Sequence, residues 1–292
     1  MALRPRRSAL YMPGSNARAL EKAKNVAADV VIMDLEDAVA PEAKAEARGQ
    51  VMAAIGAGGF GRREVVVRIN GQGTPWGRDD LAAAARAGAD AVLLPKVETA
   101  RDLGAVATAL AEAGAPDTLQ VWAMIETPLG ILNVAAIAEA STHVPRSRLS
   151  CLILGTNDLV KETRAELDAN RTAALYWLSA TVTAGKAYGL DVLDGVYNNF
   201  KDAEGLAREC RQGRQLGMDG KTVVHPDQIA TANDVFAPSA TEISAAEKII
   251  AAFERPENKG QGVITLDGRM VELLHADMAR RTIAIARAVA AA

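Results

Sequence analysis

The chain has 292 residues, 49% of them hydrophobic, which suffices for one large domain or for two smaller ones. Its formal net charge is -3, and the basic residues are scattered among acidic ones, so the basic stripe of a nucleic-acid-binding protein is missing. No apolar run approaches membrane-spanning length, and neither Cys151 nor Cys210 belongs to a CxxC pair, which excludes a thiolate zinc site and a disulfide framework. The apolar stretch near the start is interrupted by Pro13 and Gly14 too early for a signal peptide, so we expect a cytoplasmic protein.

Short and almost continuous apolar runs recur along the chain and predict eight β-strands. The runs are SALYM (8–12), DVVIMDLE (29–36), EVVVRIN (64–70), DAVLLPKV (90–97), QVWAMIET (120–127), SCLILGTND (150–158), DVLDGVY (191–197) and GKTVVHP (220–226). Continuous apolar runs are typical of parallel strands that are covered on both faces. Between them, apolar residues recur at helical spacing in segments such as 77–87, 98–112, 170–188 and 202–217.

This alternation of eight strands with helices predicts an α/β fold, a closed (β/α)8 TIM barrel over residues 1–236. An open doubly wound sheet is less well supported, because no GxGxxG follows the first strand. Beyond a Pro-Ser turn, two further helices are expected at about 241–254 and 273–290, and the polar, glycine-rich stretch 255–268 between them is interpreted as a mobile linker. We expect residues 237–292 to form a helical extension that covers the barrel's own mouth or contacts a neighbouring subunit.

Charged residues gather where the predicted strands end, which is where active sites of parallel barrels lie. They include Asp34, Glu36, Asp37, Arg68, Lys96, Glu126, Asp158 and Asp194. Several carboxylates that face one small space repel each other and take up protons unless a cation lies among them. Ligation by oxygen alone, without His or Cys, points to a hard ion, Mg²⁺ or alternatively Mn²⁺.

Specific roles follow for five of these residues. Glu126 and Asp158 end neighbouring strands and are the expected metal ligands, with Glu36 and Asp37 as acceptors for waters on the metal. Arg68 can bind a substrate carboxylate through two parallel hydrogen bonds, so that the metal and Arg68 together specify a 2-oxo or hydroxy acid. For any one of these residues, loop solvation or a buried ion pair is the alternative interpretation.

Lys96 and Asp194 complete the set of strand-end residues. Lys96 is a candidate for substrate binding. Asp194 is a catalytic candidate that we expect to order the polar network and not to transfer the proton itself.

Seven segments of the chain resemble the citrate lyase β-subunit-like branch of the HpcH/HpaI aldolase family. They are RSALYMPGSNARALEKA, VIMDLEDAVAPEAKAEAR, VVVRINGQGTPWGRDDL, LLPKVE, MIETPLGILN, LGTNDL and GKTVVHPDQIATANDVFAPS. The resemblance implies a trimeric or hexameric, Mg²⁺-dependent barrel enzyme that cleaves or forms 3-hydroxyacyl-CoA thioesters such as malyl-, citramalyl- or citryl-CoA. It gives Glu126, Asp158, Arg68, Glu36 and Asp37 the same roles as the residue-based assignment.

The same resemblance implies contacts with coenzyme A from the YMPGS turn and the GKTVVHP segment. The residues concerned are Tyr11, Pro13, Ser15, Lys22 and His225. The alternative for His225 is a structural histidine at the end of the eighth strand, and the alternative for Lys22 is a solvated helix face.

A departure from the family pattern lies near the carboxyl end of the chain. Malyl-CoA and citramalyl-CoA lyases carry an Asp in a late motif, about GxMVD, which a neighbouring subunit donates as acid/base; here Glu272 stands at that place. Glutamate moves the carboxylate by one methylene, so lyase activity is not simply inherited. The malyl-CoA thioesterase branch is more similar to this VExLH pattern, in which His275 follows Glu272 by one helical turn. Alternatively, Glu272 only starts the last helix and pairs with Arg269 or Arg280.

The first expectation is therefore an Mg²⁺-dependent acyl-CoA lyase that joins or separates acetyl-CoA and a 2-oxo acid, with Glu272, Arg68 and Asp194 as catalytic candidates. The runner-up is a (3S)-malyl-CoA thioesterase, which uses the same metal and CoA site but directs water at the thioester. A non-catalytic CoA-binding subunit and an aldolase acting on CoA-free acids are further alternatives. The carboxylates of the metal site are retained, which argues against a non-catalytic subunit, because unpaired buried carboxylates would only cost stability.

Overall fold

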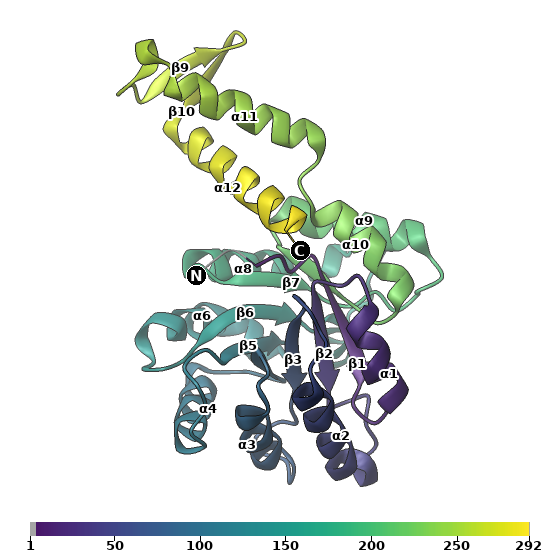
Figure 1. Cartoon of the computed structure of the whole chain (residues 1–292). Helices are drawn as coiled ribbons and strands as arrows, with labels where there is room; N and C mark the ends of the chain where they lie inside the picture. Colours follow the sequence, from purple (N-terminus) through teal and green to yellow (C-terminus); the bar gives the residue numbers. More distant parts are fainter. Residues whose placement is uncertain (1–3, 292) are drawn as a thin grey trace. The chain divides into compact units, whose positions relative to one another are not determined.

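The eight apolar runs form the strands of one closed parallel barrel in the computed structural model, which describes residues 4–291 (Figure 1). The strands are β1 (Ser8–Pro13), β2 (Val30–Asp34), β3 (Glu64–Arg68), β4 (Ala91–Leu94), β5 (Gln120–Ile125), β6 (Leu149–Leu154), β7 (Asp191–Asp194) and β8 (Gly220–Val223). Each strand pairs in parallel with the next, and β8 closes the barrel by pairing with β1 through Ser8 and Lys221. The predicted (β/α)8 architecture is confirmed.

Helices connect consecutive strands and cover the outside of the barrel (Figure 1). They are α1 (Ala17–Lys22), α2 (Lys44–Ala57), α3 (Gly77–Ala87), α4 (Ala100–Glu112), α5 (Pro128–Leu132), α6 (Val134–His143), α7 (Thr156–Thr163), α8 (Leu175–Ala187), α9 (Ala203–Leu216) and α10 (Ile229–Phe236). Local signals set their ends: Asp102 accepts the N–H groups of Glu98 and Thr99 before α4, and α3 stops at Gly88, whose φ of 87° suits glycine. Within the described residues, every helix is too short or too polar to cross a membrane.

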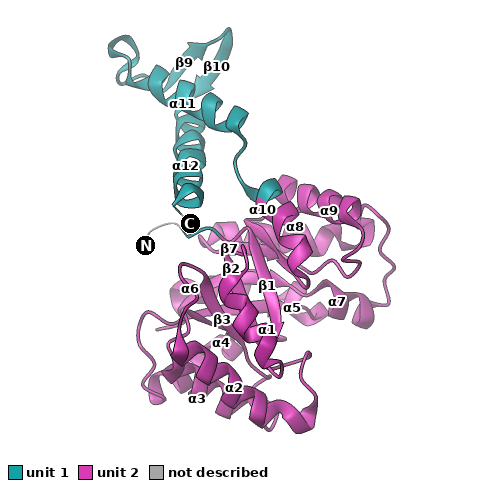
Figure 2. Ribbon diagram, turned by 45° about the vertical axis from the view of Figure 1, so that its right-hand side comes forward, with its two compact units in different colours: residues 1–5, 234–292 teal, residues 6–233 magenta. Residues whose placement is uncertain are grey.

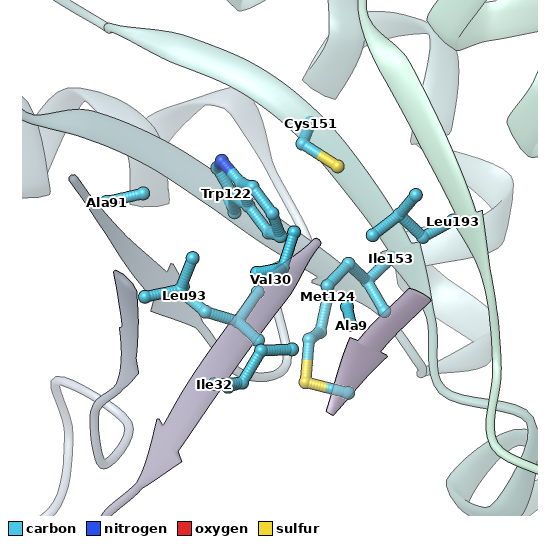
Figure 3. Packing of buried hydrophobic residues seen from close by; sticks show 11 residues of the cluster. Ala9, Val30, Ile32, Ala91, Leu93, Trp122, Met124, Cys151, Ile153 and Leu193 are labelled. Atoms are coloured by element: carbon cyan, nitrogen blue, oxygen red, sulfur yellow. The ribbon is translucent and has the colours of Figure 1, made fainter. Parts of the chain in front are cut away.

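The barrel interior is filled at its amino end, which leaves the carboxyl end for a site. Buried side chains from β1 to β7 form one hydrophobic cluster with Trp122, which is fully buried (Figure 3). Below it, Arg6 lies 4.7 Å from the Trp122 ring and donates at 2.7 Å to both Glu64 and Asp191. These contacts close the amino end of the barrel with an apolar plug and an ion-pair cluster.

The described chain divides into two compact units, residues 6–233 and a second unit of residues 4–5 and 234–291, with the boundary at residue 234 inside α10 (Figure 2). The second unit contains α11 (Ala240–Glu254), β9 (Val263–Leu266), β10 (Arg269–Glu272) and α12 (Leu273–Ala290). The interpretation of residues 255–268 as a mobile linker is wrong, because β9 and β10 form an antiparallel hairpin. Its turn is Asp267-Gly268, with φ of 52° and 75°, and Ile264 and Val271 pack on Ala252.

Candidate active site

Arg68 is the centre of a charged network at the carboxyl end of the barrel. The register of β2 against β3 places Asp34 beside Arg68, which donates from Nε at 2.7 Å and from Nη2 at 2.6 Å to the Asp34 carboxylate. The guanidinium carbon lies 4.9 Å from the Tyr11 ring below it, and Nη1 is 2.8 Å from Glu36 Oε2. Asp34 therefore holds one edge of the guanidinium, and the edge formed by Nη1 and Nη2 is the one directed towards the remaining carboxylates.

The loop after β2 is folded so that two carboxylates lie over this network. Asp34 accepts the backbone N–H of Glu36 at 2.8 Å and that of Ala38 at 3.2 Å, while Lys44 donates to the Glu36 carbonyl at 2.8 Å. Asp37 Oδ2 is consequently 3.6 Å from Arg68 Nη1, but its side chain is 62% exposed. Burial raises the pKa of Glu36; Arg68 opposes this rise, and Asp37 adds to it.

Glu126 is as deeply buried as Asp34, with 1% of its surface exposed. Its Oε1 accepts the backbone N–H of Lys96 at 2.8 Å. A Cβ at Gly155 would lie 2.5 Å from Glu126 Oε2, so glycine is required for this close approach. Burial raises the pKa of Glu126 to about 7, and the negative charges of Glu36 and Asp158 contribute.

Lys96 connects the carboxylates to one another. It has a φ of 50°, in the left-handed region, and this conformation directs its N–H at Glu126. Its ammonium donates to Glu36 Oε1 at 3.1 Å and is 3.9 Å from Asp158 Oδ1. Asp158 lies in the first turn of α7 with its side chain 22% exposed. Lys96 thus links both predicted metal ligands and one of the predicted acceptors.

The donor set of this site fits Mg²⁺. No group of three or more His, Cys, Asp or Glu side chains in the described part of the chain is placed to hold a metal ion. Mg²⁺ commonly takes only one or two protein carboxylates and keeps waters or substrate oxygens as its other ligands, so Glu126 and Asp158 suffice. The raised pKa of Glu126 is consistent with a cation at this place, because burial and the neighbouring negative charges disfavour the charged carboxylate unless a cation compensates them.

Asp194 lies in a separate, fully buried ion-pair network. Its carboxylate accepts from Arg171 Nη1 at 2.8 and 2.9 Å and from Lys221 Nζ at 3.3 Å. Burial alone would raise the pKa of Asp194, but Lys221 and Arg171 hold it below its usual range. A carboxylate that is bound in this way is poorly suited to proton transfer. The sequence analysis missed both cations; a lysine within the eighth apolar run was a signal for Lys221, and no local signal marked Arg171.

The candidate CoA residues are distributed over the carboxyl-terminal edge of β1 and β8. Tyr11 lies beneath Arg68, Pro13 ends β1, and the side chains of Ser15 and Lys22 are exposed before and at the end of α1. His225 follows β8, stacks on Phe200 with ring centroids 4.8 Å apart, and accepts the Asp227 N–H at 3.2 Å through Nδ1. Tyr11 therefore belongs to the charged network through its contact with Arg68. His225 has an aromatic partner, Phe200, which the sequence analysis did not name.

Glu272 belongs to the second unit, as the last residue of β10 and the N-cap of α12. Its backbone N–H donates to His275 Nδ1 at 3.0 Å, so the two residues face each other at the start of the helix. Arg280 pairs with Asp277 at 2.7 Å, in place of the pairing with Glu272 that we considered. The position at the start of the last helix agrees with the alternative interpretation, and a catalytic role for the carboxylate stays a prediction.

Comparisons with known proteins give a consistent picture. A family model described as HpcH/HpaI aldolase/citrate lyase matches residues 7–226. A (3S)-malyl-CoA thioesterase from Cereibacter sphaeroides is 49% identical over 287 residues, which cover 98% of this chain and 96% of the relative. An L-malyl-CoA/beta-methylmalyl-CoA lyase from the same species is 36% identical, with 92% of this chain and 91% of the relative covered. Among solved structures, protein CitE from Mycobacterium tuberculosis in complex with magnesium, acetoacetate and coenzyme A has a TM-score of 0.79 at 28% identity, covering 98% of this chain and all of that one.

Proposed function

Because the chain belongs to the HpcH/HpaI aldolase/citrate lyase family, we propose that it is an Mg²⁺-dependent (3S)-malyl-CoA thioesterase. The observation that carries this proposal is the 49% identity to a (3S)-malyl-CoA thioesterase over almost the whole of both chains, against 36% to a malyl-CoA lyase. The expectation from sequence placed the lyase first, and these identities favour its runner-up. Glu272, where the lyases carry Asp, points in the same direction.

The barrel residues bind and orient the substrate in this proposal. Glu126 and Asp158 would hold the ion, with Glu36 and Asp37 as acceptors around it. When bound, Mg²⁺ would polarise substrate oxygens and neutralise negative charge next to the thioester. Arg68 would bind the malyl carboxylate through Nη1, the nitrogen that Asp34 does not hold, and the substrate would replace the contact of Nη1 with Glu36.

Hydrolysis needs a base for water, and we assign that role to Glu272 of a neighbouring copy of the chain. The water oxygen forms a bond to the thioester carbonyl carbon, and the carbon–sulfur bond breaks. Glu272 takes the proton of the attacking water and returns it to the leaving sulfur, so that malate and free CoA are the products. Lys96, 43% exposed at its side chain, keeps a positive charge between the carboxylates and faces the substrate.

The CoA part of the substrate would lie along β1 and β8. Pro13 ends β1, Ser15 and Lys22 follow it, and His225 follows β8, the strand that pairs with β1. The CitE structure, a complex with magnesium, acetoacetate and coenzyme A, supports the ion and CoA as ligands of this chain. Donation of Glu272 by a neighbour requires a homo-oligomer, which the family resemblance implies to be a trimer or a hexamer.

A Claisen-type lyase acting on the same substrates is the second candidate. It is supported by the malyl-CoA lyase relative and by the presence of every residue expected at the metal site. In that reaction the C2–C3 bond of the malyl group breaks, and the products are acetyl-CoA and glyoxylate.

One incubation distinguishes the two reactions. The full-length protein is given (3S)-malyl-CoA, and separately citramalyl-CoA, with Mg²⁺ or with EDTA, and acyl-CoA, free CoA, malate, glyoxylate and pyruvate are followed by chromatography. We expect free CoA and malate to appear in equal amounts and only with Mg²⁺. Acetyl-CoA with glyoxylate would replace the thioesterase by the lyase, and no turnover of either substrate would reject both.

A further inference from the structure

We propose that Arg171, Asp194 and Lys221 form a buried positioning network that fixes the start of α7 and the loop that follows it, and thereby holds Asp158 in place for the metal ion. This inference rests on the proposed function, because it assumes that Asp158 is a metal ligand. Asp194 and Lys221 have no exposed surface and Arg171 has 3%, although all three carry charge. Arg171 and Lys221 have no part in the chemistry proposed above, so their burial calls for another explanation.

The loop that follows α7 is anchored at its far end through Arg171. This residue lies eight positions beyond Thr163, where the helix ends, and its backbone has a φ of 54°, an unfavourable conformation for arginine. Its side chain compensates with bonds from Nη1 to Asp194 and, at 2.9 Å, to Glu209, and from Nε to Gln212 at 2.7 Å. The loop after α7 is therefore tied to β7 and to α9.

The amino end of α7 is held through Gly195. Lys221 donates to the Gly195 carbonyl at 2.5 Å, and the Gly195 N–H donates to Asp194 at 2.8 Å, which fixes this peptide at the end of β7. A Cβ at Gly195 would lie 2.7 Å from Thr156 Oγ1 and 2.8 Å from the Leu154 carbonyl. The pinned glycine thus packs directly against the first residue of α7.

These two contacts bracket the helix that carries the metal ligand. Asp158 follows Thr156 by two residues, so a movement of the helix start moves its carboxylate relative to Glu126. A buried ion network is a poor source of stability, since well-packed apolar residues of similar volume do as well or better. The role of the network here is to fix α7 in one position.

The test compares two buried arginines that lie at opposite ends of the same barrel. Arg171→Met removes the network's loop anchor, and Arg6→Met removes an arginine with similar ion pairs, to Glu64 and Asp191, at the closed end. Mg²⁺ affinity of the full-length protein is measured by calorimetry, together with hydrogen exchange of residues 156–163. We expect Arg171→Met to weaken Mg²⁺ binding about 10-fold and to speed exchange in α7, as is typical for residues that support metal ligands. Arg6→Met should lower the melting temperature and leave Mg²⁺ binding unchanged.

Further variants keep the outcome decisive. Arg171→Lys should recover part of the affinity, and the charge-balanced double variant Asp194→Asn with Lys221→Met replaces Arg171→Met if the latter does not fold. Unchanged Mg²⁺ affinity in the network variants, or an equal loss in Arg6→Met, would overturn the inference alone. Wild-type protein that binds no Mg²⁺ would overturn the proposed function and this inference with it.

Discussion

Glu126 is almost completely buried, and a bound cation would stabilise the negative charge of its carboxylate. Glu126→Gln is therefore a sharp test of the metal site. The amide keeps the shape of the side chain but cannot supply the negative charge that Mg²⁺ needs. We expect the rise in melting temperature on addition of Mg²⁺ to vanish and turnover of (3S)-malyl-CoA to fall about 100-fold. Thermal unfolding with and without Mg²⁺ and steady-state kinetics measure the two effects.

Glu64→Gln is the matched control, since Glu64 is also buried but binds Arg6 at the closed end of the barrel. It should destabilise the fold and leave the Mg²⁺-induced rise intact. A Glu126→Gln protein that still gains stability from Mg²⁺ would remove Glu126 from the ligand set.

Asp194 makes the stability of the folded chain depend on pH. Its pKa is lowered in the folded chain, so its contribution is present above the unfolded pKa and is lost as pH falls through the folded pKa. Asp194→Asn should therefore cost about 3 kcal/mol of unfolding free energy near pH 7, because Arg171 and Lys221 lose a buried partner. The difference from wild type should shrink as the pH falls below about 4, because the Asp194 carboxylate then takes up a proton in the unfolded chain while the folded chain still holds it charged. Urea unfolding at several pH values checks this, and a difference that stays constant down to pH 3 would contradict the lowered pKa.

At the scale of elements, the turn between β6 and α7 brings the backbone of Gly155 close to the side chain of Glu126, the proposed metal ligand. Gly155→Ala would place a Cβ 2.3 Å from the Glu126 Cβ, so either the turn or Glu126 must move. We expect Mg²⁺ affinity to fall about 10-fold, with a smaller loss of stability. Gly49→Ala in α2, where a Cβ meets nothing within 4 Å, should stabilise the protein slightly and leave Mg²⁺ binding unchanged. Equal Mg²⁺ affinity in both variants would show that the close approach at Gly155 has no bearing on the site.

The strands could be predicted because parallel strands buried on both faces are continuous apolar runs, and the runs at β2 and β3 are fully buried in the structure. The hairpin of β9 and β10 was missed although Asp267-Gly268 is a strong turn signal. Its strands are four residues each and partly exposed, so the glycines and polar residues around them outweighed a short alternating pattern.

Of the candidate site, only the residues at the ends of strands could be predicted from the sequence. Glu126, Asp158 and Arg68 could be named because each ends or directly follows an apolar run, and the barrel brings such positions together. The bond between Arg68 and Asp34 depends on the register of two strands, and Arg171 reaches Asp194 from a loop 23 residues earlier. Contacts of this kind are set by tertiary packing, and no local pattern encodes them.

At the scale of the whole molecule, the residues proposed for one reaction belong to two units. Glu126 and Asp158 lie in residues 6–233, whereas Glu272 lies in the second unit. If the second unit of one copy serves the barrel of another, two inactive variants can complement each other. The Glu126→Gln chain has a defective metal site in its barrel but an intact Glu272. The Glu272→Gln chain lacks this carboxylate but has an intact metal site in its barrel.

We expect hetero-oligomers of these two variants, formed by co-expression with different tags and purified through both, to regain turnover of (3S)-malyl-CoA. Because purification through both tags removes the homo-oligomers, equal and random mixing leaves an intact barrel beside an intact donor at about one third of the sites of a symmetric trimer, or about one quarter of those of a hexamer. Activity between about a quarter and a third of the wild-type rate is therefore the expected result, and each variant alone should be almost inactive.

The matched control mixes Glu126→Gln with Asp158→Asn. Both changes lie in the same barrel, so each copy keeps a defective site whichever neighbour donates Glu272, and no activity should return. Full activity of Glu272→Gln alone would exclude Glu272 as the base. If Glu272→Gln is inactive and the doubly tagged mixture with Glu126→Gln stays inactive as well, the donation between copies is wrong, because Glu272 would then act on the barrel of its own chain.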